Sequence, residues 1–248
     1  VSLIKKYGVV PSWVMPETVH STGTAKYLPI LNRKLREDAL ELRALVREGK
    51  DPSARREEML AEVYNALRIL YGQPPKTFDF EYTDTDKVYH CDRGLTPKQF
   101  LDKYVGRDFD DYAVIIASPI HAVNRTYCQP FMGDVVEDGM FWLNLSQEEL
   151  EDLTIRQLQA GEGVMFSCDC HPDGDRANGY WDPDCFQYGE VLGGLTFGMT
   201  KSERLLTRDS TMNHCMMFCG VNLDENGTAN RWKIENSWGE ESGQKGYY

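Results

Sequence analysis

The chain has 248 residues, of which 41% are hydrophobic and 11% aromatic, enough for a substantial core in one large domain or two small ones. A net charge of −12 argues against binding to nucleic-acid phosphates, and there is no apolar run of about 18 residues that could cross a bilayer. Seven cysteines at irregular spacing indicate a reducing compartment and argue against a disulfide framework. We therefore expect a globular, cytoplasmic protein with neither a membrane nor a nucleic acid as partner.

The first part of the chain is predicted to be helical after an irregular start. Residues 1–23 contain several proline and glycine breakers and are expected to lack regular structure. Leucines recur at near-helical spacing over residues 24–47, and a second apolar stripe runs over residues 59–70. Gly49 and Pro52 separate the two stripes, so a packed helical hairpin is the simplest expectation.

The second part of the chain is predicted to be mostly antiparallel β structure with short helices. Ser146 and Glu149 have capping-box spacing and begin a helix that is expected to end at Gln159. Residues 215–221 and 231–235 are expected to be two strands, and the turn sequence that joins them predicts a hairpin. Further strands are expected at residues 78–82, 112–117 and 164–166, and a short helix at Thr96-Pro97. Helices followed by strands indicate the α+β class.

His214 and Asn236 stand out as candidate catalytic residues. His214 lies at the start of one predicted strand, and Asn236 follows 22 residues later at the end of the next. Their side chains can meet at one end of the hairpin, where an amide oxygen would fix the imidazole tautomer. Trp238 can lie over that hydrogen bond and exclude water. The alternative is that both polar residues merely terminate strands and that Trp238 belongs to the core.

Two motifs carry a resemblance to a known family. Residues 212–216 (MNHCM) and 235–239 (ENSWG) resemble the His and Asn motifs of papain-like cysteine peptidases. More narrowly, the chain resembles the bleomycin hydrolase and aminopeptidase C family. Supporting stretches follow in the expected order, at residues 6–11 (KYGVVP), 15–17 (MPE), 32–36 (NRKLR), 92–97 (DRGLTP) and 163–169 (GVMFSCD).

The resemblance implies part of a papain-like fold. It implies that residues 1–23 are a remnant of the helical lobe, that residues 24–110 form a helical insertion, and that residues 111–248 form an antiparallel β-barrel-like lobe. It also implies a cysteine aminopeptidase that acts on free peptide N-termini, needs no cofactor and often assembles as a homo-hexamer.

The resemblance also implies roles for individual residues. His214 would be the general base and acid, Asn236 would orient it, and Trp238 would shield their hydrogen bond. Asn213 departs from the more usual Thr of the family and is expected to contact substrate at the cleft wall.

The nucleophilic cysteine of the family has no counterpart in these residues. The family carries it in a glycine-rich loop before a long helix, and a C-G-S-C-W type sequence is absent here. The expectation is therefore that the chain is an interior fragment, inactive alone, whose partner is a preceding segment with the nucleophile.

Two other classes of function stay open on sequence grounds. One is a pseudoenzyme or interaction module without chemistry. The other is a structural metal site made by Cys168, Cys170, His171 and Cys185, although the Cys-x-Cys spacing differs from the usual zinc pattern. Buried structural cysteines are the favoured explanation of these thiols, so no metal is expected.

Overall fold

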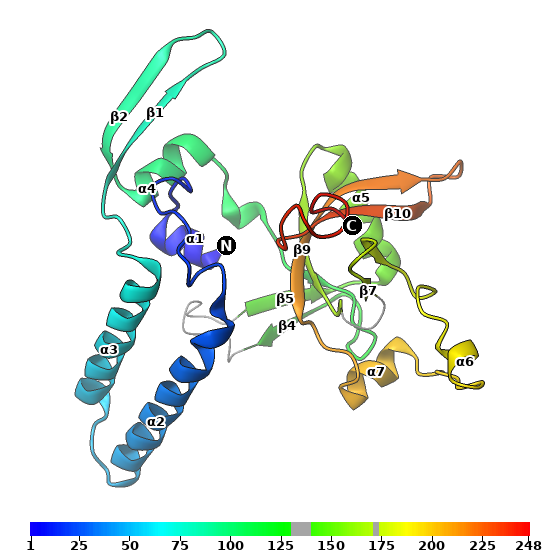
Figure 1. Cartoon of the computed structure of the whole chain (residues 1–248), viewed down its shortest axis with the longest axis horizontal. Coiled ribbons are helices and arrows are strands. Elements are labelled where there is room, and N and C mark those ends of the chain that lie inside the picture. The colour runs from blue at the N-terminus through cyan, green and yellow to red at the C-terminus, as the bar shows by residue number, and fades with distance from the viewer. Residues whose placement is uncertain (130–139, 171–173) are drawn as a thin grey trace. The chain divides into compact units, whose positions relative to one another are not determined.

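The computed structural model describes residues 1–129, 140–170 and 174–248 (Figure 1). The chain divides into two compact units, Val1–Tyr112 and Ala113–Tyr248. Within the described ranges, none of the helices combines the length and the apolar character needed to span a membrane. The elements of unit 1 are α1 (Ser2–Tyr7), α2 (Leu28–Arg47), α3 (Ser53–Tyr71), β1 (Phe78–Thr83), β2 (Tyr89–Leu95) and α4 (Pro97–Phe100).

The helical hairpin predicted for unit 1 is present as α2 and α3, which run side by side (Figure 1). Two ion pairs link the helices, with Lys34 Nζ 2.9 Å from a Glu62 oxygen and Arg55 Nε 2.7 Å from a Glu41 oxygen. The expectation of an irregular start was wrong in one place, because residues 2–7 form α1. This six-residue helix carries no apolar stripe long enough to reveal it in the sequence.

The β1–β2 hairpin and α4 complete unit 1. Helix α4 begins at Thr96-Pro97 with Pro97 in its first turn, as the sequence predicted. A capping box between Thr96 and Gln99, which was not predicted, closes its start. The helix then continues as a π-helical turn over Leu101–Val105. The ring of Phe80 lies 4.9 Å from that of Phe100 and 4.5 Å from that of Tyr104, so aromatic contacts hold the hairpin base against this helix.

Unit 2 contains two three-stranded sheets and a short ribbon. Its elements are β3 (Ile115–Ile116), β4 (Arg125–Gln129), β5 (Met140–Asn144), α5 (Gln147–Gln159), β6 (Val164–Cys168), β7 (Gly174–Asp175), β8 (Tyr180–Trp181), α6 (Tyr188–Val191), α7 (Lys201–Thr207), β9 (His214–Leu223) and β10 (Ala229–Glu235). The strand orders are β10-β9-β6 and β3-β5-β4, and β7 pairs with β8. The described strands do not close into a barrel.

One strand prediction for unit 2 needs correction. The strand expected at residues 112–117 is limited to β3, which pairs with β5 in parallel within the mostly antiparallel region that was expected. The β10-β9-β6 sheet is antiparallel throughout, as predicted. Helix α5 has the expected bounds and a complete capping box between Ser146 and Glu149.

The β10-β9-β6 sheet is held by packing on one face. The rings of Phe166 on β6 and Phe218 on β9 stack at 3.8 Å, and Trp232 on β10 lies 5.0 Å from Phe218. Met216 on β9 is 5% exposed and is among the most buried side chains of the described residues. This packing fixes the strand register, because a shift of one residue would bring the other face of each strand toward the core.

Candidate active site

The β9–β10 hairpin brings His214 and Asn236 to one end of the sheet. His214 is the first residue of β9, and Asn236 follows directly after β10. The register pairs Ile234 with Phe218 and Glu235 with Met217, so the chain leaves β10 close to the start of β9. The turn between the strands is organised by Asp224, whose carboxylate accepts hydrogen bonds from two backbone N–H groups of the loop.

The imidazole of His214 is hydrogen-bonded to the side chain of Asn236. Nε2 of His214 lies 2.8 Å from Oδ1 of Asn236, and the backbone N–H of Ser237 donates to the same oxygen at 2.8 Å. A backbone N–H can only donate, so the atom that it reaches must be the amide oxygen. Nε2 must therefore carry the proton that it donates to Asn236. The other ring nitrogen, Nδ1, is not used for the hydrogen bond to Asn236 and can exchange a proton with a reacting group.

Trp238 covers the imidazole. Its ring is stacked on that of His214 with a centroid separation of 4.8 Å and an interplanar angle of 23°. Asn236 itself is only 9% exposed. A buried amide meets little competition from water for its hydrogen bond, so the bond is stronger than on an open surface.

Sequence reasoning missed three residues around this stack. Trp181 on β8 and Tyr248 lie 4.4 Å apart by ring centroids, and both contact Trp238, at 5.9 Å and 5.7 Å. The guanidinium of Arg176 lies over the Trp238 ring at 4.1 Å. Arg176 and Trp181 are far from Trp238 in the chain, and Tyr248 follows it without belonging to a motif. No local sequence pattern therefore indicates these residues.

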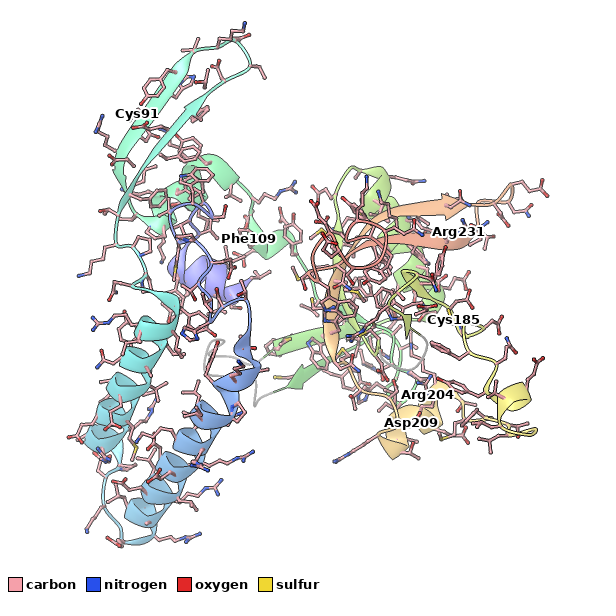
Figure 2. All side chains as sticks on the ribbon, in the orientation of Figure 1. Cys91, Phe109, Cys185, Arg204, Asp209 and Arg231 are labelled. Atoms are coloured by element: carbon pink, nitrogen blue, oxygen red, sulfur yellow. The ribbon has the colours of Figure 1, made fainter. Side chains whose placement is uncertain are left out.

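Asn213 has protein partners for its whole side-chain amide. Its Oδ1 accepts a hydrogen bond from the backbone N–H of Cys170 at 3.1 Å, and its Nδ2 donates to Asp169 at 2.6 Å. Asp169 also lies 4.0 Å from Arg204 on α7, which pairs with Asp209 at 3.0 Å (Figure 2). The side chain of Asn213 thus ties the start of β9 to the end of β6, and its expected contact with substrate stays a prediction.

Three cysteines of the chain, Cys168, Cys170 and Cys219, do not have the character of an activated nucleophile. Cys168 is the cross-strand partner of His214, and burial raises the pKa of its thiol to about 11. Burial also raises the pKa of Cys170 and of Cys219. A catalytic thiol needs a lowered pKa, since the thiolate is the attacking species. These three sulfurs are therefore suited to packing.

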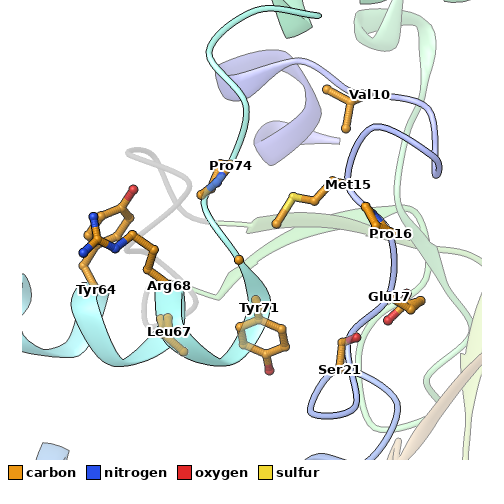
Figure 3. A pocket seen from close by; sticks show the side chains of 11 residues that line it. Val10, Met15, Pro16, Glu17, Ser21, Tyr64, Leu67, Arg68, Tyr71 and Pro74 are labelled. Atoms are coloured by element: carbon orange, nitrogen blue, oxygen red, sulfur yellow. The ribbon is translucent and has the colours of Figure 1, made fainter.

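The structure also bears on two other potential sites, a metal site and a pocket. His171, one of the four residues considered for a metal, falls outside the described residues, and the described ones contain no cluster of three or more His, Cys, Asp or Glu residues that could hold an ion. Unit 1 has a pocket of about 520 Å³ whose lining is mainly apolar and aromatic, with Glu17 and Arg68 as its charged residues (Figure 3). It shares no residue with the His214 site.

The model of the peptidase C1-like family matches residues 1–248. The chain belongs to this family. It is 43% identical to aminopeptidase E of Lactobacillus helveticus, and the match covers the whole chain and 57% of that protein. It is 41% identical to aminopeptidase C of Listeria innocua, and the match covers the whole chain and 56% of that protein. The peptidase C1-like chain therefore spans a little over half the length of these curated relatives.

A solved structure agrees with this assignment. The crystal structure of PepW from Lactobacillus rhamnosis matches the C1-like chain with a TM-score of 0.92 at 43% identity, over all of this chain and 56% of that one. The α+β, papain-like character predicted from the sequence is thus confirmed.

Proposed function

We propose that this chain is the His- and Asn-bearing part of a cysteine aminopeptidase that hydrolyses peptide bonds next to free N-termini. One observation carries the proposal. The Nε2–H of His214 is donated to the buried oxygen of Asn236, which leaves Nδ1 available for proton transfer, and the Trp238 ring is stacked on the imidazole. The curated relatives that match the whole chain are aminopeptidases by name, which supports the same class of reaction.

In the proposed reaction, a cysteine thiolate attacks the carbonyl carbon of the scissile amide. His214, as imidazolium, gives its Nδ1 proton to the leaving amine, and an acyl-enzyme remains. The neutral ring then takes a proton from water, which attacks the thioester and releases the amino acid. Asn236 transfers no proton; its neutral amide orients the ring without competing with the thiolate for the positive charge.

We propose that the nucleophilic cysteine is supplied by a segment outside these 248 residues. The support is the high pKa of Cys168, the cysteine paired with His214 across the sheet, together with the raised pKa values of Cys170 and Cys219. A thiol held in its neutral form is a poor nucleophile at neutral pH. The 248-residue chain alone is therefore expected to be inactive.

The test is an assay of the longer protein of which we propose this chain is a part. It should release the N-terminal residue from aminoacyl amides and from peptides with a free N-terminus, and a thiol alkylator should block the reaction. N-acetylated versions of the same peptides are the matched control and should not be cleaved. Cleavage of acetylated and free peptides at equal rates would reject an aminopeptidase, and no cleavage of either would favour the pseudoenzyme or interaction module.

We further propose that the longer protein forms a homo-oligomer, with a hexamer as the specific expectation. Several large apolar side chains of the α2–α3 hairpin are exposed, among them Ile30 at 70%, Leu40 at 68% and Ile69 at 80%. Exposed apolar groups of this size favour contact with another protein surface. Sedimentation velocity of the longer protein tests this, since a single monomeric species across concentrations would contradict it.

A further inference from the structure

Arg176 lies in a tightly held turn beside the candidate active site. The turn joins β7 to β8, and the Asp175 carboxylate accepts hydrogen bonds from the backbone N–H groups of Ala177 and Asn178 at 3.1 Å. The side chain of Asn178 also donates to Asp175, at 2.7 Å, and together these bonds lower the pKa of the Asp175 carboxyl. The backbone around Arg176 therefore has little freedom.

The turn also packs closely against the C-terminal loop and the end of β6. Gly179 is buried, has a φ of +76°, and has no room for a side chain, because an added Cβ would lie 3.0 Å from Cα of Gly243. Next to it, the indole N–H of Trp181 donates to the carbonyl of Cys170 at 2.8 Å. These contacts fix the turn relative to the loop that carries Trp238.

From this turn, the Arg176 guanidinium reaches over the indole of Trp238, 4.1 Å from the ring centroid. The His214 ring is stacked on the same indole at 4.8 Å. The Trp238 indole therefore contacts both the Arg176 guanidinium and the His214 imidazole.

We propose that Arg176 is a positioning residue that holds Trp238 in its stack on the His214 ring and so protects the His214–Asn236 hydrogen bond. The proposal rests on the catalytic role of His214 given above. Planar guanidinium groups bind indole faces well, and such contacts are worth more when water is excluded. Without the guanidinium, the indole loses one of the contacts that hold it in place and can move away from the imidazole, so that water competes for the amide oxygen of Asn236.

The sign of a pH effect separates this role from a simple charge effect. If Arg176 acts through Trp238, its loss weakens the hydrogen bond that stabilises the imidazolium, and the alkaline limb of the kcat/KM profile moves to lower pH. If Arg176 acts only as a nearby positive charge, its loss favours the imidazolium, and the alkaline limb moves to higher pH.

The experiment uses the longer peptidase and the variants Arg176→Ala, Arg176→Lys and Trp238→Ala. We expect Arg176→Ala to lower kcat by about two- to fivefold, with little change in KM and with the alkaline limb at lower pH. Arg176→Lys restores a cation over the ring and should recover part of the loss. In the Trp238→Ala background, Arg176→Ala should have no further effect, since the indole through which it acts is gone.

Arg231→Ala is the matched control, because Arg231 is an exposed arginine on β10 and its removal changes the net charge equally (Figure 2). It should leave kcat and the pH profile unchanged. The proposal is overturned if Arg176→Ala behaves like Arg231→Ala, if its alkaline limb moves to higher pH, or if it lowers kcat as much in the Trp238→Ala background as alone. Absence of activity in the unmodified peptidase would instead reject the proposed function.

Discussion

Two histidines in this chain have nearly the same local geometry but different partners. In unit 2, Nε2 of His214 lies 2.8 Å from the Asn236 oxygen. The Trp238 ring is stacked on this imidazole with a centroid separation of 4.8 Å and an interplanar angle of 23°. In unit 1, Nε2 of His90 on β2 lies 2.7 Å from an oxygen of Asp84. The Tyr82 ring is stacked on this imidazole with a centroid separation of 4.8 Å and an interplanar angle of 18°. Each histidine thus has one side-chain oxygen and one aromatic ring as partners.

The difference lies in charge and burial. Asp84 is a carboxylate whose side chain is 31% exposed, and that of His90 is 40% exposed. The hydrogen bond from His90 lowers the pKa of the Asp84 carboxyl. Asn236 is neutral and 9% exposed. A carboxylate favours a lasting ion pair with its histidine, whereas a buried neutral amide fixes the ring without holding its charge. If His214 has the proposed role, ring orientation alone does not make a catalytic histidine.

The largest expected effect is that of removing the His214 ring. Under the proposed function, His214→Ala should lower kcat of the longer protein by about 10³-fold or more, because the proposed proton transfers use this imidazole. His90→Ala is the matched control and should leave kcat within about twofold, since surface substitutions usually have small effects. Comparable losses in the two variants would mean that the two histidines do not differ in function.

Exchanging the partners tests the role of charge. Asn236→Asp gives His214 the partner type of His90, and the carboxylate should stabilise the imidazolium, so the alkaline limb of the kcat/KM profile moves to higher pH. Asn236→Ala should lower kcat by about ten- to a hundredfold, less than His214→Ala, because orientation is lost and proton transfer is retained. Asp84→Asn, the reverse exchange in unit 1, should not change the profile.

The aromatic rings stacked on the two histidines are also expected to differ in their effect on kcat. Trp238→Ala should lower kcat by about three- to tenfold, because water gains access to the His214–Asn236 bond. Tyr82→Ala removes the corresponding ring from His90 and should affect only the thermal stability of the protein. Both are measured by steady-state kinetics and thermal unfolding, and a loss of kcat in Tyr82→Ala would contradict the assignment of the site to unit 2 alone.

The smallest effect concerns the acid sensitivity of the β1–β2 hairpin. The backbone N–H of Val88 donates to the Asp84 carboxylate at 2.9 Å. Since the Asp84 pKa is lowered in the folded chain, its stabilising contribution is present above the ordinary aspartate pKa and is lost as pH falls through the lowered value. Hydrogen exchange should therefore show reduced protection of the Val88 amide in acid beyond its intrinsic pH dependence. Asp84→Asn should remove this effect, and a pH-independent protection factor in the unmodified protein would contradict it.

The part of the site that could be predicted is the part encoded by local signals. The turn at Asp224 and the apolar strands beside it indicate a hairpin, and the hairpin places His214 near Asn236. The Ser146–Glu149 capping box likewise gives the start of α5. In each case the residues that interact are close in the chain or joined by one turn.

The rest depends on contacts between distant segments. Arg176 meets Trp238 only because the β7–β8 turn packs on the C-terminal loop, and no pattern in the sequence specifies that approach. The parallel pairing of β3 with β5 is also non-local, and a strand of two residues has no periodicity to detect. The neutral state of Cys168 follows from its burial, which becomes visible only when the sheet is assembled.

The most direct test of the central claim is the reactivity of each cysteine in the longer protein. Iodoacetamide labelling at about pH 6, followed by peptide mass spectrometry, identifies any thiol with a lowered pKa. We predict one rapidly labelled cysteine outside the 248 residues, which becomes slow in His214→Ala, while Cys168 stays unreactive in both proteins. Rapid labelling of a cysteine within this chain, or a fast thiol indifferent to His214, would contradict the account.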